Sequence, residues 1–165
     1  MKKKVFYSLI LALTLGLCAC QKTDKDQTPP VISSEDFTPE NCDIYYLGDT
    51  VKVHFSCTDN NELGNFNIEI HSNFDHHTHS TEAGSCEEEH EQSVDEHIEE
   101  EHSHLQGWIY NKDFSIPEGQ TSYIVDLEIV VPEDAEEGDY HFMLRLTDKT
   151  GWQTIKSASI KIIKS

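Results

Sequence analysis

The sequence has 165 residues, with 12 Lys and Arg against 31 Asp and Glu, and its formal net charge is −19. Such a charge would repel phosphates and excludes nucleic acid as a partner, while the length suits one domain that carries an insertion. An interior membrane span is also excluded, because no internal apolar run approaches the ~20 residues that a span needs.

The N-terminus is typical of a secretory signal, since residues 2–4 are lysines and residues 5–17 are apolar. Residues 17–20 (LCAC) resemble the lipobox of bacterial lipoproteins, which implies cleavage before Cys20 and acylation of its thiol and new amino group. The alternatives are an ordinary cleaved signal and an N-terminal membrane helix. We expect a signal peptide over residues 1–19, then lipidated Cys20 and a flexible tether over 20–30. Gln21 favours an outer-membrane lipoprotein of the cell envelope, on its periplasmic or surface face.

From residue 31 onward, apolar and polar residues alternate with a period of two. Turn-forming residues separate the alternating runs. About seven short strands with a turn roughly every dozen residues predict an all-β fold, an immunoglobulin-like β-sandwich over residues 31–165. The clearest predicted strands are residues 51–57, 65–74, 123–131, 140–146 and 154–163.

Beyond Cys20, the chain has three cysteines, at positions 42, 57 and 86. An exported protein can form disulfides, but an odd number of cysteines leaves one thiol over. Cys42 and Cys57 flank a short segment with a turn at residues 48–49, so these two are the first candidates for a disulfide. Cys86 lies beside histidines, where it is a free thiol, an intermolecular bridge or a metal ligand.

A long acidic, histidine-rich insertion interrupts the sandwich at residues 73–105, which hold eleven acids and seven histidines. No Lys or Arg occurs between Lys52 and Lys112. Such a block cannot bury a core and should form a long loop, and long loops in compact domains are usually functional. Acidity alone would indicate only a solvated face, but neutral imidazole is the commonest metal ligand. The histidines are His76, His77, His79, His90, His97, His102 and His104.

The alternation of inward and outward residues along the strands predicts where two further histidines, His71 and His141, lie. In the strands that contain His71 and His141, the apolar residues are even-numbered, so both histidines should face solvent. If these strands are neighbours in one sheet, the two imidazoles lie close together. The insertion leaves directly after His71 and can fold His77 and His79 over the pair. Four nitrogens suit zinc, with copper or nickel as competitors. His54 lies on a strand of the opposite sheet and should be unrelated.

The later part of the insertion offers further ligands. Residues 87–101 can form a helix that places His90, His97 and His104 on one face. Like charges oppose such a helix until cations bind, so the tract either becomes ordered with metal or remains a loop that buffers metal loosely. The secondary candidate ligands are His76, His90, His97, His102, His104 and Cys86.

Three segments, residues 70–79 (IHSNFDHHTH), 138–142 (GDYHF) and 146–151 (LTDKTG), resemble domain-of-unknown-function family 4625. Its members are small Ig-like lipoproteins of Gram-negative anaerobes and their relatives, and the resemblance covers roughly residues 29–163. It implies a lipid-anchored sandwich with no assigned enzymatic activity. Its motif positions here are His71, His77, His79 and His141. The tract 86–104 is longer and richer in acid and histidine than we expect of the family.

These features lead to one main functional hypothesis, a lipid-anchored envelope protein that captures or buffers zinc and hands it to an outer-membrane transporter. The alternative is an Ig-like surface adhesion or glycan-binding module with no metal role, with Trp108, Tyr110 and Trp152 as candidate contacts. The usual nucleophile–base motifs are missing from the sequence, so we predict no enzyme, although an open position on a histidine site would suit a metalloenzyme. Candidate calcium ligands, in turns that need Asp and Asn anyway, are Asp59, Glu62 and Asp148.

Overall fold

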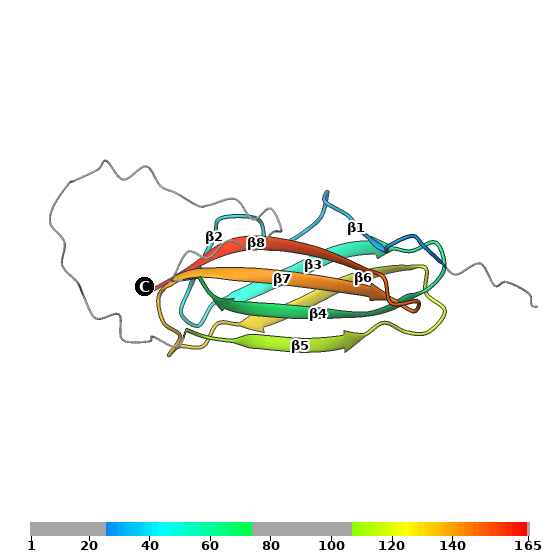
Figure 1. Ribbon diagram of the computed structural model, residues 1–165. Helices are drawn as coiled ribbons and strands as arrows, with labels where there is room; N and C mark the ends of the chain where they lie inside the picture. Colours follow the sequence, from blue (N-terminus) through cyan, green and yellow to red (C-terminus); the bar gives the residue numbers. More distant parts are fainter. Residues whose placement is uncertain (1–25, 74–106, 165) are drawn as a thin grey trace, which may run out of the picture.

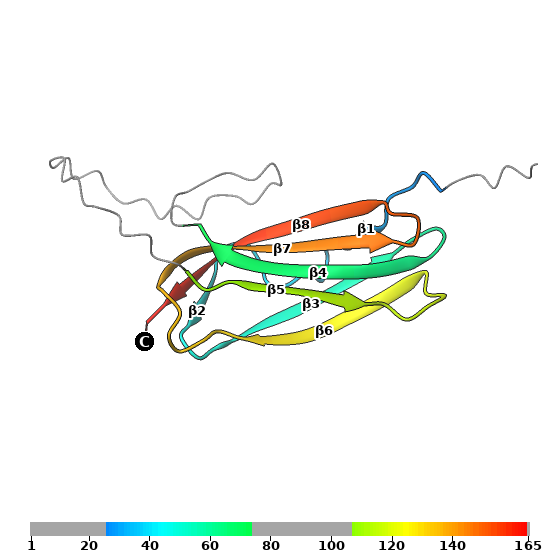
Figure 2. The ribbon, with the colours of Figure 1, turned by 60° about the horizontal axis from the view of Figure 1, so that its bottom comes forward.

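The protein is an all-β sandwich in the computed structural model, which describes residues 26–73 and 107–164 (Figure 1). Two sheets pack face to face, and all eight strands lie between residues 31 and 163 (Figure 2). The described part of the chain contains no helix, and hence none long and apolar enough to cross a membrane. The signal, the lipidation site and nearly all of the insertion lie outside the described residues, and those expectations stay predictions.

The smaller sheet has three antiparallel strands in the order β1-β3-β6. β1 (Val31–Ile32) is short and pairs with the end of β3 (Thr50–Thr58). β3 pairs along its whole length with β6 (Ser122–Val130).

The larger sheet has five strands in the order β2-β8-β7-β4-β5. β4 (Leu63–Ser72) and β7 (Gly138–Asp148) are its central pair, flanked by β5 (Tyr110–Ser115) and β8 (Gln153–Ile163). β2 (Asp43–Tyr46) pairs with β8 in parallel, whereas the other pairs are antiparallel. Figure 1 shows that β4 ends, and β7 begins, at the same end of the sandwich.

Alternation along the strands builds the core between the sheets. In β4 and β7 the even-numbered apolar residues face inward, and Ile68, Ile70, Phe142 and Leu144 are fully buried. Each such side chain stabilises the fold by about 1.5–3 kcal/mol relative to an exposed one. The same parity leaves the odd-numbered residues, among them His71 and His141, on the outer face of the larger sheet.

The five strands predicted from periodicity are confirmed, with ends that differ by up to two residues. Three further strands, β1, β2 and β5, were not predicted. β1 and β2 are too short for a periodic signal, and β5 carries exposed polar residues at positions 111–113. The all-β sandwich is therefore confirmed, while its immunoglobulin-like character stays a prediction.

The predicted disulfide between Cys42 and Cys57 is wrong. Cys57 is a free thiol, buried in the core from β3 of the smaller sheet, and its Sγ lies 3.5 Å from the carbonyl oxygen of Tyr123. Cys42 is exposed just before β2, at the edge of the larger sheet, and is disulfide-bonded. Because Cys57 is free, it is not the partner of Cys42. The partner of Cys42 is thus one of the three cysteines outside the described residues.

Candidate metal centre

The two histidines singled out by parity lie directly opposite each other. In the antiparallel pairing of β4 with β7, the register partner of His71 is His141. Directly opposed residues on one face of such a pair have Cβ atoms about 4.5–5.5 Å apart, so their side chains touch. The centroids of the two imidazole rings are 5.6 Å apart, with planes inclined by 58°. The predicted proximity of these rings on one sheet is confirmed.

A carboxylate completes the described part of this site. Glu69 lies two residues before His71 on the same face of β4, and its Oε1 is 3.2 Å from Nδ1 of His71. A carboxylate at Nδ1 holds an imidazole in one orientation and leaves Nε2 as the nitrogen for a metal. The described part of the site therefore has two imidazoles and one carboxylate close to Nδ1 of His71.

The expectation that both rings face open solvent is wrong for His141, which is only 6% exposed. Its strand is interior to the sheet, and its register partners, His71 on β4 and Ser159 on β8, flank it on both sides. The side chain of His71 is 17% exposed. Partial burial lowers the local dielectric constant and strengthens electrostatic interactions at the pair.

The ring spacing suits one tetrahedral metal ion. Zinc binds imidazole nitrogen at about 2.0–2.1 Å, which places the centres of two coordinated rings roughly 5 Å apart. The observed separation of the ring centroids, 5.6 Å, is close to that value. A structural zinc site needs four ligands, so the pair would supply half of them.

The remaining predicted ligands lie outside the described residues. These are the primary candidates His77 and His79 and the secondary candidates His76, Cys86, His90, His97, His102 and His104. Both ends of the insertion are nevertheless attached beside the pair. The N–H of Asn73 donates to the carbonyl of Asp139 at 2.7 Å, and the N–H of Trp108 donates to the hydroxyl of Tyr140 at 3.2 Å. The insertion thus leaves and re-enters the sandwich next to His141.

His54 lies on the smaller sheet and is separate from this site, as predicted. Its Nδ1 is 2.6 Å from Oδ1 of Asp126, its register partner on β6, and its Nε2 is 3.5 Å from Oδ2 of Asp36. The hydrogen bond to Asp126 raises the pKa of His54 above its ordinary value. This histidine is engaged in an ion-pair network of its own.

A second group of possible metal ligands was only partly predicted. Asp59 and Asp148 do come together, but the third member is Asp26, which lies within the predicted tether. Glu62 is occupied elsewhere, since its Oε1 accepts a hydrogen bond from the N–H of Gly119 and lies 4.0 Å from Nζ of Lys149. Nothing in the polar segment before β1 distinguishes Asp26 from its neighbours.

The aromatic residues proposed for glycan contact are mostly part of the fold. Trp108 and Tyr110 pack against the core, and the ring of Trp108 lies 6.2 Å from that of Tyr140. Trp152 is 44% exposed, but its indole N–H donates to the carbonyl of Asp26 at 2.9 Å. The described residues therefore present no cluster of exposed aromatic rings at these positions.

Comparisons with known proteins identify the family of this chain. No curated protein matches the chain. The crystal structure of Spo0M, a sporulation control protein from Bacillus subtilis, is 8% identical and matches with a TM-score of 0.38, covering 84% of this chain and 50% of that one. The chain thus spans about half the length of that protein, and a likeness at this level does not bear on function. The family described as Domain of unknown function (DUF4625) matches residues 18–163, and this chain belongs to it.

Proposed function

We propose that this protein is a lipid-anchored protein of the cell envelope that captures or buffers zinc, or another divalent transition metal, for hand-off to an outer-membrane transporter. The observation that carries the proposal is the direct opposition of His71 and His141, with ring centres 5.6 Å apart. Two imidazoles already held side by side reduce the ordering cost of assembling a metal site. The lipobox-like residues 17–20 support the anchor.

The place of the insertion supports the same function. Its ends attach to β7 at Asp139 and Tyr140, the residues immediately before His141. A tract with seven histidines and eleven acids therefore starts and finishes beside the pair. Its histidines can supply the missing ligands, and its carboxylates supply the negative potential that attracts cations. A preformed metal site beside a segment with many weaker metal ligands suits the collection and transfer of metal better than its permanent storage.

The test is calorimetric titration of residues 21–165, without a histidine tag, with Zn²⁺ at pH 7.5. This chain retains all eight strands and the core. We expect at least one tightly bound ion, and at least a tenfold loss of affinity in the double variant His71→Ala/His141→Ala. The matched control is His54→Ala, which removes an imidazole from the opposite sheet and should leave zinc binding unchanged. Affinity should also fall as the pH is lowered from 7.5 to 5.5, because protonated imidazole cannot bind metal.

A second variant shows where zinc binds if any binding remains in the double variant. Replacing His90, His97, His102 and His104 by Gln should leave the tight ion in place and reduce only weaker binding. Tight binding that survives the double variant and disappears in this one would place the site in the insertion and overturn the proposed pair. An absence of binding to the unmodified chain would overturn the metal function itself.

A further inference from the structure

Three aspartates from distant parts of the chain meet at the end of the sandwich opposite the histidine pair. Asp26 precedes β1, Asp59 follows β3, and Asp148 is the last residue of β7. One carboxylate oxygen from each lies within 4.8 Å of the others. Figure 1 shows that the segment before β1 and the turns after β3 and β7 all lie at this end.

Turn hydrogen bonds account for one oxygen of each carboxylate. Oδ1 of Asp59 accepts from the N–H of Asn61 at 2.8 Å, and Oδ1 of Asp26 accepts from the side-chain amide of Asn60 at 3.0 Å. Oδ1 of Asp148 accepts from three backbone N–H groups of the next turn, those of Thr150, Gly151 and Trp152. These contacts explain why each aspartate is held in place, but not why the three converge.

Two of the three remaining oxygens are unexplained by the fold, whereas Oδ2 of Asp148 accepts a hydrogen bond from the hydroxyl of Thr150 at 3.1 Å. Oδ2 of Asp26 and Oδ2 of Asp59 are buried, and neither has a hydrogen-bond partner. Asp148 is buried, neither Asp26 nor Asp59 is exposed, and no Lys or Arg of the described residues forms an ion pair with them. Buried anionic oxygens without a partner are costly, and adjacent like charges add to the cost.

We propose that this cluster binds a calcium ion. The three donors are all carboxylate oxygens, which are the hard ligands that Ca²⁺ prefers, and no nitrogen or sulfur donor belongs to the group. Oxygens up to about 4.8 Å apart can share one ion at Ca–O distances of about 2.3–2.6 Å. A divalent cation here supplies the missing partner for both buried oxygens.

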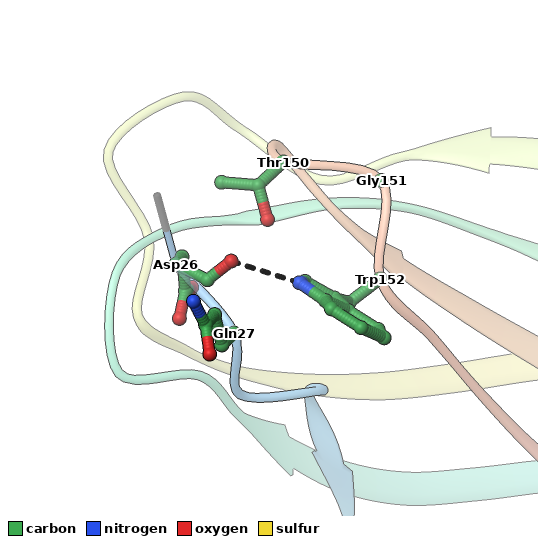
Figure 3. Close-up of a pocket in the computed structure, with 5 residues that line it drawn as sticks. All are labelled: Asp26, Gln27, Thr150, Gly151 and Trp152. Carbon is green, nitrogen blue, oxygen red and sulfur yellow. Dashed lines mark hydrogen bonds between the residues drawn. The ribbon is translucent and has the colours of Figure 1, made fainter. Parts of the chain in front are cut away.

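The ion would join the start of the folded chain to the far turns of the sandwich. Asp26 is the first described residue, and its carbonyl already accepts a hydrogen bond from the indole of Trp152, as Figure 3 shows. The hydroxyl of Thr154 donates to the carbonyl of Pro30 nearby. Calcium would thus strengthen an existing attachment of the segment that precedes β1, and would set how the sandwich is held on its N-terminal tether.

The experiment is titration of residues 21–165, first treated with EDTA and dialysed, with CaCl₂ in 0.15 M NaCl. We expect a dissociation constant in the range of about 10⁻⁵–10⁻³ M, typical of extracellular modules and weak sensors, and a Tm that rises by several degrees in excess calcium. Terbium should replace calcium and luminesce on excitation of Trp152. Mg²⁺ at the same concentration should bind more weakly, because it demands a stricter octahedral geometry.

Asp26→Asn is the decisive variant, since residue 26 lies outside every strand and its loss should not prevent folding. We expect at least a tenfold loss of calcium affinity in Asp26→Asn and in Asp59→Asn, and no change in Asp134→Asn, an exposed control. The variant His71→Ala/His141→Ala should keep its calcium, which separates this site from the proposed zinc site. Calcium binding that is unchanged in Asp26→Asn and Asp59→Asn would lie in the acidic insertion and overturn the proposal. Absence of any binding or Tm shift would overturn it as well.

Discussion

Oε1 of Glu69 lies 3.2 Å from Nδ1 of His71, two residues farther along the same face of β4. A carboxylate in this position orients a metal-binding imidazole and raises its basicity, and its removal typically lowers metal affinity 10–100-fold. We predict that Glu69→Gln weakens zinc binding about tenfold at pH 7.5, measured by calorimetry. The control is Glu128→Gln, an exposed position on β6 of the smaller sheet. Equal affinities for Glu69→Gln and the unmodified chain would remove Glu69 from the site.

The pKa of His54 gives a prediction for the smaller sheet. Its hydrogen bond to Asp126 raises this pKa, so the interaction stabilises the fold fully below the ordinary histidine pKa of about 6.5. That contribution is lost as the pH rises through the raised value. In NMR titrations the His54 resonance should therefore titrate above about pH 6.5, and its midpoint should fall in Asp126→Asn. The difference in free energy of unfolding between the unmodified protein and Asp126→Asn should be larger at pH 6 than at pH 9. The opposite trend would contradict a stabilising interaction between His54 and Asp126.

The cysteines predict a specific pattern of reactivity. Burial raises the pKa of Cys57 to about 11, and the side chain is only 1% exposed. In the native protein this thiol should not react with a disulfide reagent at pH 8, because little thiolate forms and access is blocked. After unfolding in guanidinium chloride, the thiol of Cys57 in residues 21–165 should react. Rapid reaction in the native state would contradict the buried placement.

The disulfide of Cys42 has a predictable partner if the chain is processed as a lipoprotein. Cys57 is free, so the partner is Cys18, Cys20 or Cys86. Cleavage before Cys20 and acylation of its thiol leave only Cys86. Non-reducing peptide mapping of the mature protein should therefore find Cys42 linked to Cys86, which would remove Cys86 from the candidate metal ligands. A reduced Cys86 would count against this pairing.

Gly64 sets the contact between β4 and the end of β7. A Cβ added there would lie 2.8 Å from the carbonyl oxygen of Thr147 and 2.9 Å from that of Asp148, both of them backbone atoms. We predict that Gly64→Ala lowers the free energy of unfolding by about 1–3 kcal/mol, because the backbone must shift. The neighbouring exposed Asn65→Ala should change it by no more than about 0.5 kcal/mol. Urea denaturation of both variants checks this, and equal stabilities would contradict the close approach.

The residues that could be predicted from sequence are those whose pattern repeats along a strand. Alternation over β4 and β7 placed His71 and His141 on one face, and the pairing of these strands then brought the rings together. If the inward and outward faces of β4 or β7 were exchanged by a shift of one residue, the histidine of that strand would point into the core. The burial of the neighbouring apolar residues therefore specifies the register.

Features that depend on contacts between distant segments could not be predicted. Asp26 looks like any other residue of a polar tether until Trp152 and the turns after β3 and β7 are placed beside it. The disulfide of Cys42 was predicted wrongly for a similar reason. Proximity in sequence does not reveal that Cys57, on β3, is buried in the core between the two sheets. The burial of His141 likewise depends on which strands flank β7.

The most direct test of the proposed metal centre is a crystal structure of residues 21–165 grown with zinc, with anomalous data collected at the zinc absorption edge. We predict an anomalous peak about 2.0–2.1 Å from one imidazole nitrogen of each of His71 and His141. A zinc-saturated crystal with no peak between these two rings would contradict it.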